Sequence, residues 1–442
     1  MRRNIFSDNS SQVSIFVYTE SFLDEEPSFL YFNNARKLDG IQIYYMPVLD
    51  NQNRQLPIVT GAYRSWCQEG RTFTAIEFPQ YSGIVNAHYP ANSDRTDYDN
   101  NKLAEEKILQ DESFSNLYDY VVCSDKWCQT HRNFRSVISF SECKEVLRLF
   151  LIMKKRFTLC EHFSCDETMY YVYHHKNLFD EFQNFWSACV ASGYISDWAN
   201  ALDNRLLLLS MCIDNAKIEA YKTQNNATAM QLKYHISYLL LLITGTFDNL
   251  AWLVNNLYNL GMEEKERTKI DLLKKEFRQK IEKKSFRIHE ILVKNDFINR
   301  VEAIRELRDR IVHRDFINTI FSRRADGSNQ NYLWVDRTVS DKLKKAGFPT
   351  KGFPIKISDE TSIDILMLID FLQNTTIQMV NELLKIVLVK FMIVGTNIRF
   401  GNCLTFLHNR MYYKKPRSKV LCTLLLGFYF DTTATPIRRN RL

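Results

Sequence analysis

The sequence predicts an α+β protein in which a β-rich and then mixed N-terminal domain precedes an all-α C-terminal helical bundle. Three observations support this prediction. Short runs of Val, Ile, Phe and Tyr, separated by Asn, Asp and Gly, fill residues 13–85. Long apolar and amphipathic stretches dominate from residue 197 onwards. The chain of 442 residues is also longer than one hydrophobic core usually serves, so two domains are expected.

The N-terminal domain is expected to span residues 1–195. Its strand-like runs are VSIFVY, FLYF, GIQIYYMPVL and FTAIEF. From about residue 103 the pattern becomes mixed, and SECKEVLRLFLIMKKRF and NLFDEFQNFWSACVASGY have helical periodicity. A sensing or regulatory role is the expectation for this domain.

The helical bundle is expected over residues 196–398 and a basic tail over 399–442. Expected helices cover 200–222, 228–260, 263–292, 296–317 and 360–394. Asp359 or Thr361 is suited to cap the start of the last helix. An Asp, Gly, Asn and Pro-containing connection over about 322–358 would be a long crossover, and long helices joined in this way are typical of a bundle.

Composition favours a folded chain inside the cell. Hydrophobic residues make up 45%, while only 13 Gly and 9 Pro are present, which argues against a disordered chain. The opening MRRNIFSDNSSQ has no apolar run behind its arginines, so no secretory signal is expected and the predicted location is the cytoplasm. The ten cysteines show no repeated framework and are expected to be reduced.

Two apolar stretches, 236–260 and 379–396, were tested as membrane spans. The first carries Asp248, and the second carries Glu382, Lys385 and Lys390, each costly in a hydrocarbon interior. Both stretches are therefore expected to be buried bundle helices, and no membrane partner is predicted.

The net charge of +7 is confined to the tail. Residues 399–442 contain nine Lys or Arg and one acid, a net of +8, which leaves −1 for residues 1–398. The charge of the globular body therefore does not predict nucleic-acid binding by itself.

Arg308 is the first candidate functional residue, because it falls on the apolar face of its expected helix. On a wheel at about 100° per residue with Val301 at zero, Arg308 lies at about −20°, inside the stripe of Ile304 and Leu307. A guanidinium stays charged and is expensive to bury alone. Arg308 is therefore expected to meet a carboxylate, a neighbouring subunit or a ligand phosphate.

Asp309 and His313 form an i, i+4 pair on the flank of the same face. Asp309 is expected to orient the imidazole, as carboxylates do for catalytic histidines. Together with Arg308 these side chains are sufficient for RNA cleavage without a metal. The 2'-hydroxyl is the nucleophile, a histidine takes its proton, a second acid protonates the leaving 5'-oxygen, and an arginine stabilises the phosphorane. A two-fold dimer would supply the second histidine.

The run Arg308-Asp309 followed by His313, on a late helix of a bundle, resembles the HEPN superfamily. The signature of that family is an arginine, usually followed by a polar residue, with a histidine four to six residues beyond. The resemblance covers about residues 200–395. It implies a dimeric, all-α, metal-independent endoribonuclease with Arg308, Asp309 and His313 as catalytic residues, RNA as substrate, no cofactor, and a role in antiviral defence or a toxin system.

A β-rich front domain before a HEPN domain also resembles the ApeA-like defence proteins. Asp315 stands where the toxin branch that is silenced by tyrosine modification has tyrosine, which speaks against that branch. Whether a regulatory partner exists is left open by the sequence.

Alternatives remain at each of these positions. Arg308 and His313 also fit a buried ion pair and a solvated histidine in a non-catalytic bundle that serves dimerisation or interaction. Asp248 suits either the anion for Arg308 or an ordinary helix-pair contact. A zinc site is a weaker interpretation, because the C-x4-C spacing is loose and core positions are favoured, so no metal is predicted. The residues concerned are Cys123, Cys128, Cys160 and Cys165, with His131 and His162 nearby. The histidine pair His174-His175 is expected to be a surface or partly buried pair rather than a ligand set.

Overall fold

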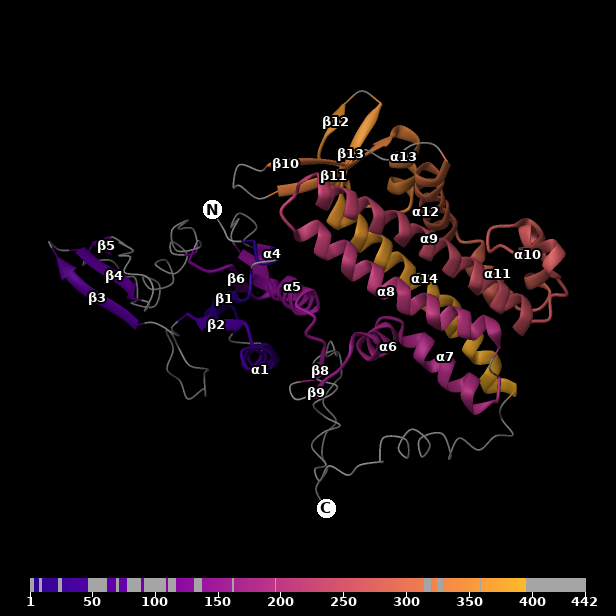
Figure 1. The fold of residues 1–442 in the computed structure, drawn as a ribbon, viewed down its shortest axis with the longest axis horizontal. Coiled ribbons are helices and arrows are strands. Elements are labelled where there is room, and N and C mark those ends of the chain that lie inside the picture. The colour runs from indigo at the N-terminus through magenta and orange to yellow at the C-terminus, as the bar shows by residue number, and fades with distance from the viewer. Residues whose placement is uncertain are drawn as a thin grey trace, which may run out of the picture. The chain divides into compact units, whose positions relative to one another are not determined.

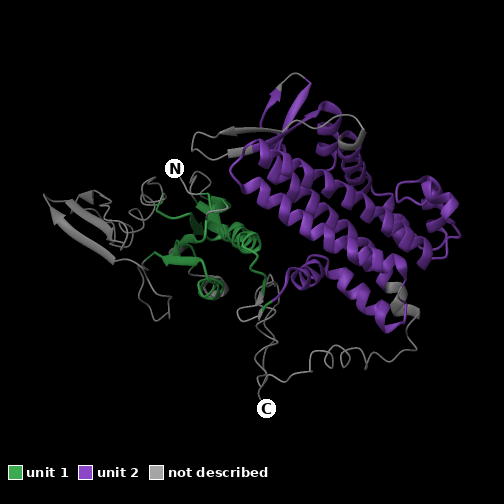
Figure 2. Ribbon diagram, viewed as in Figure 1, with its two compact units in different colours: residues 1–164, 323–328 green, residues 165–322, 329–442 purple. Residues whose placement is uncertain are grey.

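The computed structural model describes residues 4–7, 10–22, 26–46, 62–68, 71–77, 89–90, 109, 117–130, 137–160, 163–194, 196–313, 319–323, 329–357 and 359–394. Two compact units are present (Figure 2). Unit 1 contains Met1–Ser164 with Arg323–Ser328, and unit 2 contains Cys165–Ser322 with Asn329–Leu442. The prediction of a mixed α+β, mainly helical fold is confirmed.

Unit 1 is built around a parallel sheet with the strand order β2-β1-β6-β7 (Figure 1). Its strands are β1 (Val13–Val17), β2 (Ile41–Tyr45), β6 (Tyr120–Cys123) and β7 (Val137–Ser139). Parallel neighbours need a crossover connection, and α1 (Glu26–Ala35) supplies it between β1 and β2. The run FLYF, expected as a strand, lies in α1, because this crossover requires a helix.

Aromatic residues join this crossover to the next helix. Phe32 of α1 and Phe22 of the short helix η1 (Thr19–Phe22) are fully buried. Their rings lie 5.3 Å and 5.7 Å, respectively, from the ring of Phe140. Phe140 begins α5 (Phe140–Met153), whose N-cap Ser139 accepts a hydrogen bond from the Glu142 amide in a capping box. The expected helix in this segment is thus confirmed.

The remaining elements of unit 1 lie outside the parallel sheet. The strands β3 (Ala62–Gln68), β4 (Arg71–Glu77) and β5 (Tyr89–Pro90) form an antiparallel sheet, which confirms the strand expected at FTAIEF. Helix α4 (Asp125–Thr130) follows β6 directly. The pair β8 (Thr158–Cys160) and β9 (Phe163–Ser164) ends the unit's main segment.

Unit 2 is a helical bundle with an inserted sheet rather than the expected all-α bundle. Its main helices are α6 (Glu167–Leu178), α7 (Asp180–Ala191), α8 (Asp197–Tyr221), α9 (Asn226–Leu257), α12 (Asn295–His313) and α14 (Ile365–Val394). Because α6 packs on α8 and α7 packs on α14, both belong to this unit. The compact unit that holds the bundle therefore begins at Cys165, earlier than the boundary expected near residue 195.

Two expected helices differ in the structure. The helix expected over 263–292 is broken into η2 (Glu264–Lys269), α10 (Lys275–Glu282) and α11 (Phe286–Leu292). The break follows from local capping, because Asp271 accepts from the Leu273 amide and Ser285 caps α11. The helix expected at 296–317 is described only as far as His313.

The connection expected at 322–358 is a sheet and a helix rather than an irregular crossover. The strands β10 (Thr319–Arg323), β11 (Asn329–Asp336), β12 (Lys356–Ile357) and β13 (Glu360–Asp364) form a sheet in the order β10-β11-β13-β12, and α13 (Arg337–Lys345) follows β11. The segment 360–364 is therefore a strand. Asp364 accepts from the Met367 amide at 3.1 Å, so neither Asp359 nor Thr361 caps α14.

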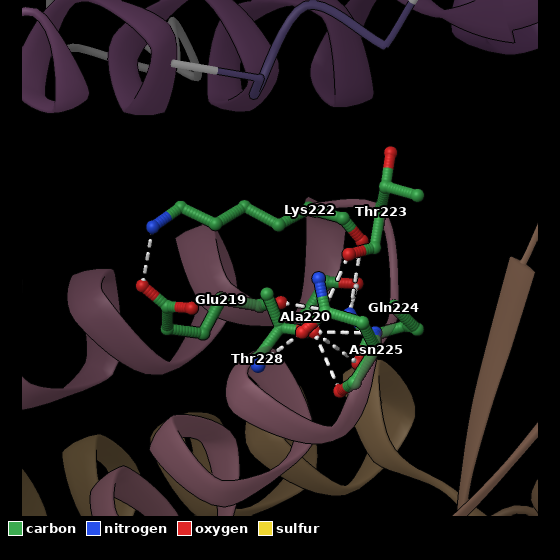
Figure 3. Close-up of polar contacts among 7 residues, drawn as sticks. All are labelled: Glu219, Ala220, Lys222, Thr223, Gln224, Asn225 and Thr228. Carbon is green, nitrogen blue, oxygen red and sulfur yellow. Dashed lines mark hydrogen bonds and ion pairs between the residues drawn. The ribbon is translucent and has the colours of Figure 1, made fainter.

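A tight polar turn joins α8 to α9 and sets these two helices side by side (Figure 3). The Gln224 side chain donates 2.9 Å hydrogen bonds to the carbonyls of Glu219 and Lys222, which lie at the end of α8. Asn225 and Thr228 form the capping box of α9. Backbone carbonyls at the end of α8 and amides at the start of α9, which have no partner within their own helix, thus gain hydrogen bonds.

Helix α9 is long and apolar enough to cross a membrane by length and composition, and it is the candidate found among the described residues. Most of its apolar window is nevertheless buried inside the bundle, and Phe247, Leu250 and Val254 are 1% exposed or less. This is the burial expected of a core helix.

Candidate functional site

Helix α12 positions the candidate catalytic residues. Val301, Ile304 and Leu307 are fully buried on its inner face, which packs against α9 and α13. The outer residues are charged, as expected for an amphipathic helix. The helix frame is therefore fixed by apolar burial, and the charged residues of its last two turns are held at defined positions.

The Arg308 guanidinium lies at the rim of the apolar face. Its side chain is 36% exposed, and its Nη1 atom donates to Asp309 Oδ1 at 2.8 Å. The Nε atom is shielded from solvent and has no hydrogen-bond partner within the described residues. The expected carboxylate partner is therefore the next residue of the chain, and Arg308 is half-buried rather than enclosed.

Asp309 is 56% exposed and directs its carboxylate to Arg308. His313 is the last described residue of α12, and its side chain lies outside the part of the chain that the structure describes. The predicted contact between Asp309 and His313 stays a prediction. The contact that the structure shows gives Asp309 a role in orienting the guanidinium.

Two further arginines and two aspartates surround this pair. Arg305, one turn before Asp309, forms a 2.9 Å ion pair with Asp271, and both side chains are largely buried. Asp248 of α9 faces the same cluster. Arg205 of α8 lies against the backbone of α9 at Gly245, where a Cβ atom would stand 1.5 Å from its Nη1. Glycine is therefore required for this approach.

The electrostatics of this cluster centre on Asp248. Its side chain reaches the surface, yet the surrounding protein removes water from the carboxyl and raises its pKa above the ordinary value of 3.8. Arg305 opposes the rise most strongly, Asp271 adds to it, and Arg205 and Arg308 oppose it less. The cluster thus places a carboxyl that protonates more readily than usual beside the Arg308 guanidinium.

Sequence reasoning named Arg308, Asp309 and Asp248 but missed Arg205 and Arg305 as members of the cluster. On the helical wheel Arg305 lies within the apolar stripe but close to its edge, and the wheel does not reveal its partner Asp271 on a distant segment. A signal for Arg205 was present, since it is the lone cation before the apolar run LLLL. Its proximity to Gly245 follows only from the α8–α9 pairing.

A second charged network lies on the other side of α12. Glu306 accepts from Lys342 of α13 at 2.7 Å and from Arg310 at 3.3 Å, and Arg310 also contacts Asp336 at the end of β11. The hydrogen bond from Lys342 is the main reason that the pKa of Glu306 lies below its usual value. This network fastens α12 to α13 and β11, and it is separate from the Arg308 cluster.

The histidine pair His174-His175 is buried and has a structural role in the bundle. His174 and His175 are 4% and 0% exposed, so the expectation of a surface or partly buried pair is wrong. His175 Nε2 lies 2.8 Å from Asp203 Oδ1, and its Nδ1 lies 2.8 Å from the Tyr171 carbonyl, which ties α6 to α8. Among the described residues, no three metal-ligating side chains gather.

Comparisons with known proteins give no match for this chain. No protein-family model, curated protein or solved structure matches it.

Proposed function

We propose that this protein is a metal-independent endoribonuclease of HEPN type that acts as a homodimer. The observation that carries the proposal is the run of Arg308, Asp309 and His313 over the last two turns of one bundle helix, with the Arg308 guanidinium held at the surface by the neighbouring carboxylate. A half-exposed, oriented guanidinium suits the binding of a phosphate that a 2'-hydroxyl attacks, and the histidine five residues later on the same helix would supply the titratable group.

Each residue has a role in the proposed reaction. His313 takes the proton of the 2'-hydroxyl or returns one to the leaving 5'-oxygen. Arg308 binds the scissile phosphate and stabilises the charge that develops on the phosphorane. Asp309 keeps the guanidinium fork oriented through the 2.8 Å hydrogen bond. RNA is the substrate and no cofactor is required.

Arg205 extends the proposed phosphate site. Within the described residues it makes no hydrogen bond or ion pair, and it lies on Gly245 close enough to Asp248 to affect its pKa. A neighbouring phosphate of the RNA strand would supply the missing anionic partner. The three aspartates of the cluster balance its three arginines, so protonation of Asp248 would favour binding of the polyanion.

The homodimer is proposed to form through an apolar patch on α8 and α9. We define this patch by its exposed large side chains: Leu208 (41% exposed), Met230 (71%), Tyr234 (61%), Tyr238 (36%) and Leu241 (41%). Aromatic residues and Met are enriched at protein interfaces. The patch continues along one face of α9 towards Gly245 and Asp248, since 234, 238, 241, 245 and 248 follow helical spacing. A two-fold axis there would bring two candidate sites together.

The wider setting rests on the same proposal. Unit 1 would sense a trigger or restrain cleavage, and antiviral defence or a toxin system in the cytoplasm is the proposed context. The C-terminal tail at 399–442, where the basic residues gather, lies outside the described residues.

The proposal is tested by incubating purified protein with single-stranded RNA in EDTA. The wild type should cleave it, while His313→Ala and Arg308→Ala should each lower the rate by about 100-fold or more, the usual size of a general acid–base contribution. Arg337→Ala is the matched control, because that side chain on α13 is 80% exposed. Loss of cleavage in all three variants, or in none, would contradict the assigned roles.

The apolar patch also favours a second candidate, a non-catalytic bundle that serves dimerisation or interaction. Under this alternative Arg308→Ala would lower the stability or the affinity of the dimer, and wild-type expression would be harmless to the host. Comparing the toxicity of the wild type with that of His313→Ala in one host separates the two candidates.

A further inference from the structure

Two cysteines of unit 1 lie next to each other where the sheet meets a helix. Cys123 is the last residue of β6 and is fully buried, whereas Cys128 on α4 is partly exposed. Both are free thiols and contribute to the same apolar cluster, which also contains Tyr18 and Val121. One thiol is thus sealed in the core and the other is open to solvent.

A short turn between β6 and α4 separates the two cysteines. Their side chains are hydrogen-bonding neighbours, and both pack into the same apolar cluster. The Cys128 amide donates to the Ser124 carbonyl at 3.0 Å, and the Trp127 amide donates to the Ser124 hydroxyl at 3.2 Å. Ser124 is itself fixed, because its amide donates to Ser21 Oγ at 3.0 Å. These hydrogen bonds fix the turn that carries Cys123 and Cys128.

The surroundings of the two thiols shift their pKa values in opposite directions. Burial raises the pKa of Cys123. The hydrogen bond with Cys123 lowers the pKa of Cys128, although burial and then the charges of Glu142 and Asp125 oppose this. By contrast, burial raises the pKa of Cys189 and of Cys212 in the bundle to about 12. Since the thiolate is the reactive form, Cys128 is suited to attack an oxidant.

We propose that Cys123 and Cys128 are a modification site that a hydroperoxide converts into a reversible intramolecular disulfide. The Cys128 thiolate attacks the distal peroxide oxygen, the O–O bond breaks, and the alcohol or water leaves after taking a proton. The resulting sulfenic acid is then attacked by the Cys123 sulfur, the S–O bond breaks, and water leaves with the Cys123 proton. Two thiols lose two electrons and the hydroperoxide gains them.

The two cysteines share no residue with the proposed RNA-cleaving site, because Cys123 and Cys128 belong to unit 1 and Arg308 belongs to unit 2. A metal site is the competing account of two adjacent cysteines, but among the described side chains no third ligand joins them. The position at the end of β6, a central strand of the parallel sheet, means that oxidation would link the sheet covalently to α4.

The experiment uses the full-length protein, reduced, freed of reductant, and treated with hydrogen peroxide in EDTA. Trypsin separates the two cysteines at Lys126, so the disulfide appears as a linked pair of peptides in mass spectrometry under non-reducing conditions. We expect this link to form, and dithiothreitol to remove it. The peptides that contain Cys189 and Cys212 are internal controls and should react at least about tenfold more slowly, because their thiolate fraction is smaller.

Two variants separate the steps. Cys123→Ser should leave a sulfenic acid on Cys128 that dimedone traps, and Cys128→Ser should leave Cys123 unmodified. Circular dichroism checks that each variant is folded, and Cys123→Ala replaces Cys123→Ser if the serine is not tolerated. The proposal is overturned if Cys128 in the wild type stays reduced, or if it proceeds to the sulfinic acid without linking to Cys123.

Discussion

At the scale of single residues, the exposure of Arg308 determines whether the candidate site can contact a substrate. Arg308 was expected to be enclosed by the apolar stripe, and the structure places it at the edge of that stripe with Asp309 as its partner. A helical wheel gives the direction of a Cα–Cβ bond but not the reach of a long side chain, which can extend its charged end to water. The angle of Arg308 was therefore predictable, and its exposure was not.

Gly245 offers a test of the Arg205 position at this scale. In Gly245→Ala the new Cβ would displace the Arg205 guanidinium, the far end of a flexible side chain, while the helix gains about 0.5–1 kcal/mol from alanine. The stability measured by urea unfolding should thus be unchanged or slightly higher. RNA cleavage should fall roughly tenfold, the size expected for one lost hydrogen bond to a charged group.

The control for Gly245→Ala is Arg205→Ala, alone and combined with it. If both changes act through the same guanidinium, the double variant should be no slower than the slower single variant. Full cleavage activity in Gly245→Ala would remove Arg205 from the site.

Asp248 should give an unusual pH dependence of stability. Its pKa is raised in the folded protein, so its contribution is fully present below the ordinary value of 3.8 and is lost as the pH rises through the raised value. Relative to Asp248→Asn, the wild type should therefore become less stable as the pH rises across this range. Urea unfolding of both proteins between pH 3.5 and 7, bounds chosen around that value, measures the difference. A constant difference would show that the carboxyl titrates normally.

At the scale of elements, prediction succeeded where periodicity was long and failed where local capping or pairing intervened. The apolar periodicity of α8 and α9 is enough to locate both helices within a few residues. By contrast, β13 and α14 are contiguous, and the alternation in Glu360–Asp364 is too short to separate a strand from the helix that follows. The breaks among η2, α10 and α11 depend on side-chain caps that a pattern of apolar residues does not reveal.

The attachment of α12 to α13 can be tested through Glu306. Its pKa is lowered, chiefly by the hydrogen bond from Lys342, so its contribution to stability is present above the ordinary value of 4.5 and is lost as the pH falls through the lowered value. Lys342→Met should lower the free energy of unfolding by up to about 1 kcal/mol at neutral pH, because the pair is partly screened by solvent. This loss of unfolding free energy should be smaller in acid, because Glu306 becomes protonated there.

The measurement is urea unfolding of the wild type and Lys342→Met at pH 7 and pH 3. Lys344→Met is a suitable control on the same helix, since the Lys344 Nζ atom lies 3.6 Å from Asp341 Oδ1 and, within the described part of the chain, makes no ion pair with Glu306. An equal loss of stability at both pH values would mean that packing rather than charge holds α13.

For the whole molecule, the sequence indicated two parts and their order, but not the parallel topology of the first. The order β2-β1-β6-β7 depends on pairings between strands distant in the sequence, such as Ile15 with Tyr120, which no local pattern records. The coarse α+β class follows from composition and periodicity. The HEPN assignment and the homodimer remain proposals that depend on Arg308, Asp309 and His313.

The proposed dimer is testable through the apolar patch. Tyr234→Glu places a charge on a side chain that is 61% exposed, so the fold should tolerate it while a hydrophobic interface should not. Sedimentation should show a wild-type dimer and a monomeric variant, with cleavage reduced in parallel. Tyr173→Glu on α6 is the matched control, because that tyrosine is 46% exposed and outside the patch. A monomeric wild type would contradict the dimer.

The most direct test of the proposed RNA cleavage removes the 2'-hydroxyl that acts as the nucleophile. An RNA oligonucleotide and the same oligonucleotide with 2'-deoxy sugars at the cleaved positions are each incubated with the wild type in EDTA. The account predicts that the RNA is cut to products ending in a 2',3'-cyclic phosphate and that the deoxy-substituted strand stays intact. Cleavage of both strands at similar rates, or of neither, would contradict it.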